Sequence, residues 1–231
     1  MIRLNHLDRA MAKILGARIW DVVAASPLLV WCLLGSWGLV SLLATEIGHF
    51  KSDDLQTWAK IITQLTSLAY VCMVIAVFFI RHLPLAKAQG ILPCVIAILA
   101  SNAQLALFLL PRAMMSTRTE ILSAALISVG AITSVWILIR LRNGFSILPQ
   151  ARALVTTGPY RRIRHPLYAA EGIASLGLML QFVEPWSAAI MLIGFACQIL
   201  RMHYEEQVLG GTFPEYSPYK ARTDRLVPGV Y

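Results

Sequence analysis

Long apolar stretches recur along this chain and constrain its fold more than any other feature of the sequence. Each of the first four is near the roughly 20 residues that a helix needs to cross a bilayer core, and they cover residues 22–47, 58–80, 90–110 and 121–139. Two shorter apolar runs follow, at residues 167–183 and 186–200. Hydrophobic residues make up 58% of the chain and charged residues only 14%, which no ordinary soluble domain shows. We predict an all-α, polytopic transmembrane bundle of about six hydrophobic helices.

The last two apolar runs are separated only by Glu184-Pro185, so we expect them to form a helical hairpin. No linker is long enough to divide the chain, and residues 1–231 are predicted to form a single membrane domain. We divide it into an N-terminal part, 1–139, with four spans, and a C-terminal part, 140–231, that contains the hairpin. Small residues in the first arm of the hairpin permit close helix packing, and they are Ala169, Ala170, Gly172, Ser175 and Gly177.

The N-terminal segment before the first span has its own pattern. Its apolar residues recur at three- and four-residue steps, which is typical of an amphipathic interfacial helix, and they are Leu4, Leu7, Met11, Leu15 and Ile19. Basic residues are spread through the same segment, at Arg3, Arg9, Lys13 and Arg18. Because a signal peptide confines its charge to a short first region, we expect none here.

The 20 basic residues predict which side of the membrane each loop faces. With six passes, the segments on the side of the N-terminus hold Arg3, Arg9, Lys13, Arg18, Arg81, Lys87, Arg140, Arg142, Arg152, Arg161, Arg162, Arg164, Arg201, Lys220, Arg222 and Arg225. The opposite side holds Lys51, Arg112 and Arg118, with Lys60 near the start of a span. Basic loops are typically cytoplasmic, so both termini are predicted to be cytoplasmic. The same bias explains the net charge of +8 without nucleic acid as a partner.

The four cysteines do not form a pattern that binds metal or supports redox chemistry. Each lies inside an apolar run, at Cys32, Cys72, Cys94 and Cys197, without paired spacing. The five histidines are also scattered along the chain. We therefore expect no metal centre.

The most polar stretch of the C-terminal part, residues 156–168, has features of an anion site. Gly158-Pro159 predicts a turn, and Pro166 suits the first position of the helix that follows, where its missing N–H is not needed. Free backbone donors at such a helix start attract carboxylate or phosphate, and Arg161, Arg162 and Arg164 are near. Anchoring by the positive-inside rule explains about half of the arginines in the loop 140–165, but it does not explain the turn or His165-Pro166 at the helix start.

Three glutamates complete the candidate residues. Glu205 and Glu206 lie near the end of the last apolar helix, where the helix dipole disfavours carboxylates, so we expect positive partners. Adjacent helical residues point about 100° apart, so one can face the bundle while the other meets the basic stretch. Glu171 lies inside the fifth span, where a charge is costly. It is expected to pair with Arg161 or Arg164, or to meet a ligand.

These motifs together resemble the isoprenylcysteine carboxyl methyltransferase family, to which phospholipid N-methyltransferases are related. The resemblance is carried by Asn143-Gly144-Phe145-Ser146-Ile147, Leu154-Val155-Thr156-Thr157-Gly158-Pro159-Tyr160-Arg161, Arg164-His165-Pro166-Leu167-Tyr168 and Glu205-Glu206. It covers roughly residues 140–231. One departure is Ala170, where the family usually has glycine.

The resemblance implies that the protein binds S-adenosyl-L-methionine and methylates a lipophilic small molecule or lipidated acceptor that enters from the membrane lipids. The cofactor site, on the cytoplasmic side, would comprise Tyr160, Arg164, His165, Pro166, Leu167, Tyr168, Glu205 and Glu206. The helix start and the arginines suit the cofactor's carboxylate, a glutamate suits its ammonium or ribose, and a tyrosine suits adenine or sulfonium. If the acceptor is an amine, Glu171, His203 or one of the glutamate pair, such as Glu206, can take its proton.

Two other functions remain open at this point. A membrane reductase of the sterol or steroid 5-alpha-reductase kind would use the same arginines for the phosphates of NADPH. A transporter or scaffold would use the basic loop to recruit anionic lipid or a partner. The identity of the acceptor, and whether oxygen, nitrogen or sulfur is methylated, stay open, as does the oligomeric state.

Overall fold

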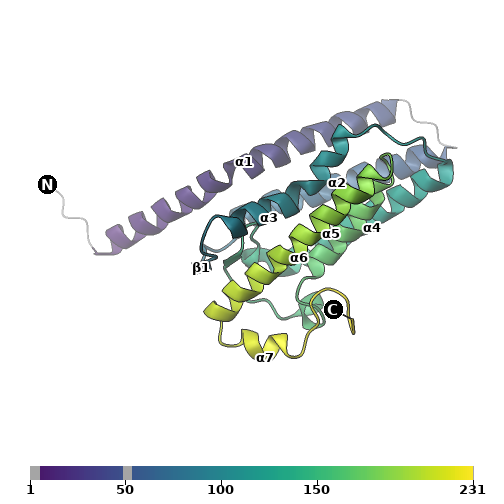
Figure 1. The fold of residues 1–231 in the computed structure, drawn as a ribbon. Helices are drawn as coiled ribbons and strands as arrows, with labels where there is room; N and C mark the ends of the chain where they lie inside the picture. Colours follow the sequence, from purple (N-terminus) through teal and green to yellow (C-terminus); the bar gives the residue numbers. More distant parts are fainter. Residues whose placement is uncertain (1–5, 49–53, 231) are drawn as a thin grey trace.

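A computed structural model describes residues 6–48 and 54–230 and is an elongated bundle of helices (Figure 1). It is 72% helical with almost no sheet, which confirms the predicted fold class. The longer helices are α1 (His6–Gly48), α2 (Leu55–Ile80), α3 (Leu92–Asn102), α4 (Thr117–Leu141), α5 (Pro166–Met179) and α6 (Trp186–Thr212). Shorter elements are β1 (Ala86–Lys87), η1 (Ala103–Leu109), η2 (Arg142–Gly144), β2 (Gln150–Ala151), η3 (Gly158–Arg161) and α7 (Tyr216–Lys220).

Within residues 6–48 and 54–230, five segments are long and apolar enough to cross a membrane, and the chain is a multi-pass integral membrane protein. They are Leu29–Gly48, Leu55–Ile80, Leu92–Leu109, Thr117–Gly144 and Trp186–Thr212. The first arm of the predicted hairpin, α5, is shorter. Its 14 residues extend about 21 Å at 1.5 Å per residue, less than the bilayer core. The hairpin itself is present, because α5 and α6 follow each other through the short turn at Glu184-Pro185.

The N-terminal helix differs from the expectation of an interfacial helix followed by a separate span. From His6 to Gly48 the chain forms one continuous helix of 43 residues (Figure 1). No proline interrupts residues 6–26, where the break was expected, so helix propagates there at little cost, and the helix also continues through Pro27. Leu4 of the amphipathic pattern lies outside the described residues.

The helices α4 and α5 pack closely because glycines form their interface. A β-carbon at Gly130 would lie 2.6 Å from the backbone nitrogen of Ala174, and one at Gly177 would lie 2.7 Å from the carbonyl oxygen of Ser123. Such distances exclude any side chain without movement of the backbone. The hydroxyl of Ser123 also donates to the carbonyl oxygen of Gly177, at 2.7 Å. The small residues in α5 therefore set its position in the bundle.

Loops that are distant in sequence join at each end of the bundle. At one end, β1 pairs with β2 and the amide of His82 donates to the carbonyl of Asn143. At the other end, the amide of Ala113 donates to the carbonyl of Gln181 and that of Val183 to the carbonyl of Pro111. A hydrophobic core at the first end contains Val74, Val77, Phe78, Ile137, Leu138, Phe145, Tyr160, Leu167 and Ala170. This end carries the candidate site.

Candidate functional site

The stretch before α5 has a fixed local structure. Gly158 has a φ of +64°, which favours glycine, and it begins the short helix η3. Tyr160 in η3 is buried, and its carbonyl oxygen accepts a hydrogen bond of 2.8 Å from the hydroxyl of Tyr219. Burial raises the pKa of Tyr219 to about 12, so this hydroxyl keeps its proton at neutral pH. Pro166 then occupies the first turn of α5, as the sequence predicted.

The C-terminal tail holds the motif from the other side. The backbone amides of Arg164 and His165 donate to the carbonyl oxygens of Asp224, at 2.8 Å, and Arg225, at 3.0 Å. The guanidinium of Arg164 also donates to the carbonyl oxygens of Lys220 and Thr223. These bonds place α7 and the tail directly under the start of α5.

Glu206 is the centre of a buried ion cluster. Its side chain is 2% exposed, and its carboxylate lies 2.9 Å from Nε of Arg164, 3.0 Å from Nε of Arg225 and 3.1 Å from Nζ of Lys220. Nε2 of His165 lies 3.3 Å from the same carboxylate. Both oxygens are thus used by the protein's own side chains, and the positive partners expected for a carboxylate at this helix end are present.

Glu205 points into the bundle instead. Its Oε1 accepts hydrogen bonds from the hydroxyl of Tyr168, at 2.5 Å, and from Nε of Arg201, at 3.1 Å. Arg201 is buried, donates to Ser101 on α3 at 2.9 Å and lies 4.7 Å above the ring of Tyr168. The two adjacent glutamates therefore face different surroundings, one the bundle and one the basic stretch.

His165 links the two carboxylates. Its ring stacks on that of Tyr168, with centroids 5.4 Å apart and planes 7° apart. Its two nitrogens face the two glutamates, since Nδ1 lies 3.9 Å from Glu205 and Nε2 lies 3.3 Å from Glu206. The side chain is buried, so the ring is held in one orientation between the cluster and the bundle.

The structure corrects the expected partners of the charged residues. Of the two alternatives for Glu171, pairing with Arg161 or Arg164 is wrong, since its Oε1 accepts a 2.7 Å hydrogen bond from the hydroxyl of Tyr70 on α2, and contact with a ligand stays a prediction. Arg161 and Arg162 are exposed at the surface, and Arg164 is engaged with Glu206. The three arginines therefore do not surround a common anion at the helix start.

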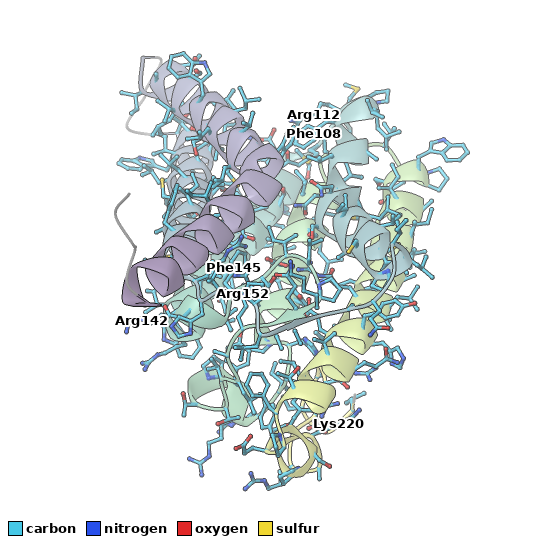
Figure 2. The ribbon with its side chains drawn as sticks, turned by 90° about the vertical axis from the view of Figure 1, so that its left-hand side faces the viewer. Phe108, Arg112, Arg142, Phe145, Arg152 and Lys220 are labelled. Carbon is cyan, nitrogen blue, oxygen red and sulfur yellow. The ribbon has the colours of Figure 1, made fainter. Side chains whose placement is uncertain are left out.

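A cavity of about 970 Å³ runs through the bundle. In Figure 2, Phe108 and Arg112 lie near one end of the molecule and Lys220 lies near the other. Phe108 and Arg112 line the cavity, and at the opposite end so do Arg164, His165, Leu167, Tyr168, Glu205, Tyr216 and Tyr219. Between these ends the lining is mostly apolar and includes Glu171 and Tyr70. Tyr160 also lines the cavity, whereas Pro166 and Glu206 do not.

The chemistry of this cavity end fits S-adenosylmethionine. Glu205 and Arg201 offer both signs of charge to a zwitterion, and the Tyr168 ring offers an aromatic face. Gln198 lies one turn before Arg201 on α6 and lines the same cavity, and its buried Oε1 has no hydrogen-bond partner among the residues that the structure describes. Buried polar atoms are usually paired, so an unpaired one beside a cavity favours a polar ligand there.

Ala170, which stands where the related family usually has glycine, does not line the cavity. Ala170 is 2% exposed and packs against α4, where its carbonyl oxygen lies 2.7 Å from the position of a β-carbon on Gly130. Gly172 is the residue that lines the cavity, and a β-carbon there would have open space around it. Approach of a ligand at this level of α5 is therefore unobstructed.

Several residues of the site have no signal in the sequence. Tyr70 and Ser101 are each one of several polar residues within apolar helices, and only the packed bundle brings them to Glu171 and Arg201. Lys220 and Arg225 read as ordinary basic residues of the tail. An indirect signal was available for these two, because a carboxylate pair at a helix end requires positive partners.

Comparison with known proteins supports the resemblance. Residues 119–215 match the model of the phospholipid methyltransferase family. Over 80 residues the chain is 40% identical to the nickel-cobalt-cadmium resistance protein NccN of Alcaligenes xylosoxydans xylosoxydans, covering 32% of this chain and 36% of that protein. Over 80 residues it is 36% identical to the cobalt-zinc-cadmium resistance protein CzcN of Cupriavidus metallidurans, covering 32% of this chain and 35% of that protein.

The chain thus spans about a third of the length of these curated relatives. The family match begins within α4, earlier than residue 140, and ends just before α7. It includes the motif at the start of α5 and the glutamate pair on α6. The predicted relation to this group of membrane methyltransferases is confirmed for residues 119–215.

Proposed function

We propose that this chain, whose residues 119–215 match the phospholipid methyltransferase family, is an S-adenosylmethionine-dependent methyltransferase that acts on a lipophilic acceptor. The observation that carries the proposal is the cavity, which joins a charged, aromatic end to a long apolar interior. A polar cofactor and an apolar acceptor need these two environments in contact. The basic residues at the charged end favour the cytoplasmic side for this end and for both termini.

The cofactor would lie at the charged end, against Glu205, Arg201 and Tyr168. S-adenosylmethionine supplies a methyl group on a positively charged sulfur. Glu205 suits the cofactor's ammonium or ribose hydroxyls, and the Tyr168 ring suits its sulfonium or adenine. Glu206 does not touch the cavity, so we assign it a positioning role: it holds Arg164 and His165 beneath α5.

The acceptor would lie in the apolar interior, with its reacting group near Glu171. Glu171 lines the cavity on α5, one turn from Tyr168, and Tyr70 fixes its carboxylate by a hydrogen bond. Methyl transfer requires the acceptor atom in line with the methyl and the sulfur, and a fixed carboxylate can orient that atom. For an amine acceptor, Glu171 would also take the proton. His203 and Glu206, the other candidates for this role, do not line the cavity.

The arrangement favours a methyltransferase over a reductase that binds NADPH. A dinucleotide needs several cations for its phosphates, and of the three expected arginines only Arg164 lines the cavity. Arg161 and Arg162 are exposed outside it, and Arg164 is bound to Glu206. Arg201, which does line the cavity, is bound to Glu205.

The proposal is tested by following a labelled methyl group. Purified protein is incubated with methyl-labelled S-adenosylmethionine and membranes of the cells in which the chain occurs, and lipids are then extracted and separated. We expect label in a lipid or lipidated product, which identifies the acceptor. Glu171→Gln should reduce the rate at least tenfold, because a neutral amide orients the acceptor less strongly and takes no proton. No transfer to any membrane component would contradict the proposal.

A further inference from the structure

Two tyrosines of the short helix α7 lie under the cofactor end of the cavity. Tyr216 and Tyr219 are 3% and 6% exposed, and both line the cavity. Their rings contact each other edge to face, with centroids 6.0 Å apart. They are one turn apart on the same helix, so they form a matched pair.

The hydroxyls of this pair differ in one respect. Tyr219 donates to the carbonyl oxygen of Tyr160, at 2.8 Å. The hydroxyl of Tyr216 is buried and has no hydrogen-bond partner within the described part of the protein. Leaving such a group unpaired is costly, and buried hydroxyls are usually bonded to protein, water or ligand. Tyr216 therefore favours a partner that comes from outside the chain.

The charges near Tyr216 indicate the kind of partner. Arg164 lines the same end of the cavity as Tyr216, whereas Glu206 does not line it. A hydroxyl donor and a guanidinium on one wall of a cavity suit a carboxylate.

We propose that the hydroxyl of Tyr216 donates a hydrogen bond to the carboxylate of the cofactor's amino-acid portion. This inference rests on the proposed function and adds a binding residue beyond the segment that matches the family, which ends at residue 215. The adenosine portion would then lie farther into the cavity, toward Tyr168.

The test compares two ligands and two variants by calorimetric titration in detergent. S-adenosylhomocysteine has the amino-acid portion, and 5′-methylthioadenosine lacks it. Tyr216→Phe should bind S-adenosylhomocysteine about tenfold more weakly, bind 5′-methylthioadenosine as the unchanged protein does, and unfold at the same temperature. Tyr219→Phe is the control, and it should unfold at a lower temperature yet keep its affinity for S-adenosylhomocysteine.

Three results would overturn the inference. Equal affinity of Tyr216→Phe and unchanged protein for S-adenosylhomocysteine would exclude the hydrogen bond. Equal weakening for both ligands would place the contact on the adenosine portion. If the unchanged protein bound neither ligand, the proposed function itself would be wrong, and that result is distinct from the first two.

Discussion

At the scale of single residues, the adjacent carboxylates of Glu205 and Glu206 have separate roles. Glu205 lines the cavity and contacts Tyr168 and Arg201. Both carboxylate oxygens of Glu206 are bound by Arg164, Lys220 and Arg225, and Glu206 does not line the cavity. Of the two acidic residues, Glu205 is therefore a candidate to bind the cofactor, and Glu206 holds the surrounding protein segments in place.

This division predicts the effect of Glu206→Gln. A neutral amide leaves three cations near one another around a buried side chain, so we expect the free energy of unfolding to fall by about 3 kcal/mol. Thermal unfolding in detergent measures the loss. The control is Glu215→Gln, which changes the charge equally at an exposed position and should alter stability by less than about 0.5 kcal/mol. Equal unfolding temperatures for Glu206→Gln and the control would contradict the ion cluster.

The sequence predicted the chemical character of these residues better than their partners. The 100° spacing of neighbouring residues on a helix correctly indicated that the glutamates face different ways. For Glu171 the sequence left open a pairing with Arg161 or Arg164 or contact with a ligand, and it did not indicate Tyr70. Tyr70 is 101 residues away and becomes a neighbour because α2 and α5 both pack against α4. Pairings of this kind depend on tertiary packing, which the periodicity of apolar residues in the sequence does not reveal.

At the scale of elements, the position of α5 depends on its glycine interface with α4. We predict that Gly130→Ala lowers the free energy of unfolding by about 1–3 kcal/mol, since the new methyl group meets backbone atoms of α5 that cannot rotate away. Thermal unfolding again measures the change. Gly38→Ala on α1 is the matched control, because no atom lies within 4 Å of its added carbon. A Gly130→Ala variant as stable as the control would contradict the packing described.

The sequence predicted the positions of the helices well, but it predicted the extent of α1 and of α6 less well. Apolar length indicated each span, and Pro166 correctly marked the start of α5. The helix α6 continues beyond the apolar run 186–200 and through Gly210-Gly211 to Thr212, since glycine lowers helix stability without preventing helix formation. The continuity of α1 was also missed, because an amphipathic pattern followed by an apolar one does not itself require a break.

At the scale of the whole molecule, one cavity connects the two ends of the bundle. Its charged end is closed by α7 and the tail, which are held by Arg164 and Glu206, and its apolar interior lies between the membrane helices. The central claim is that this charged end binds S-adenosylmethionine. The cavity joins residues from all six long helices, so sequence motifs confined to residues 140–231 describe only part of its lining.

The most direct test of this claim is a calorimetric titration of the purified protein with S-adenosylhomocysteine and, separately, with NADPH. We expect saturable binding of S-adenosylhomocysteine to one site, no response to NADPH, and at least tenfold weaker binding of S-adenosylhomocysteine by Glu205→Gln, because the amide loses the charge that attracts the ligand's ammonium. Saturable binding of NADPH without any response to S-adenosylhomocysteine would contradict the account.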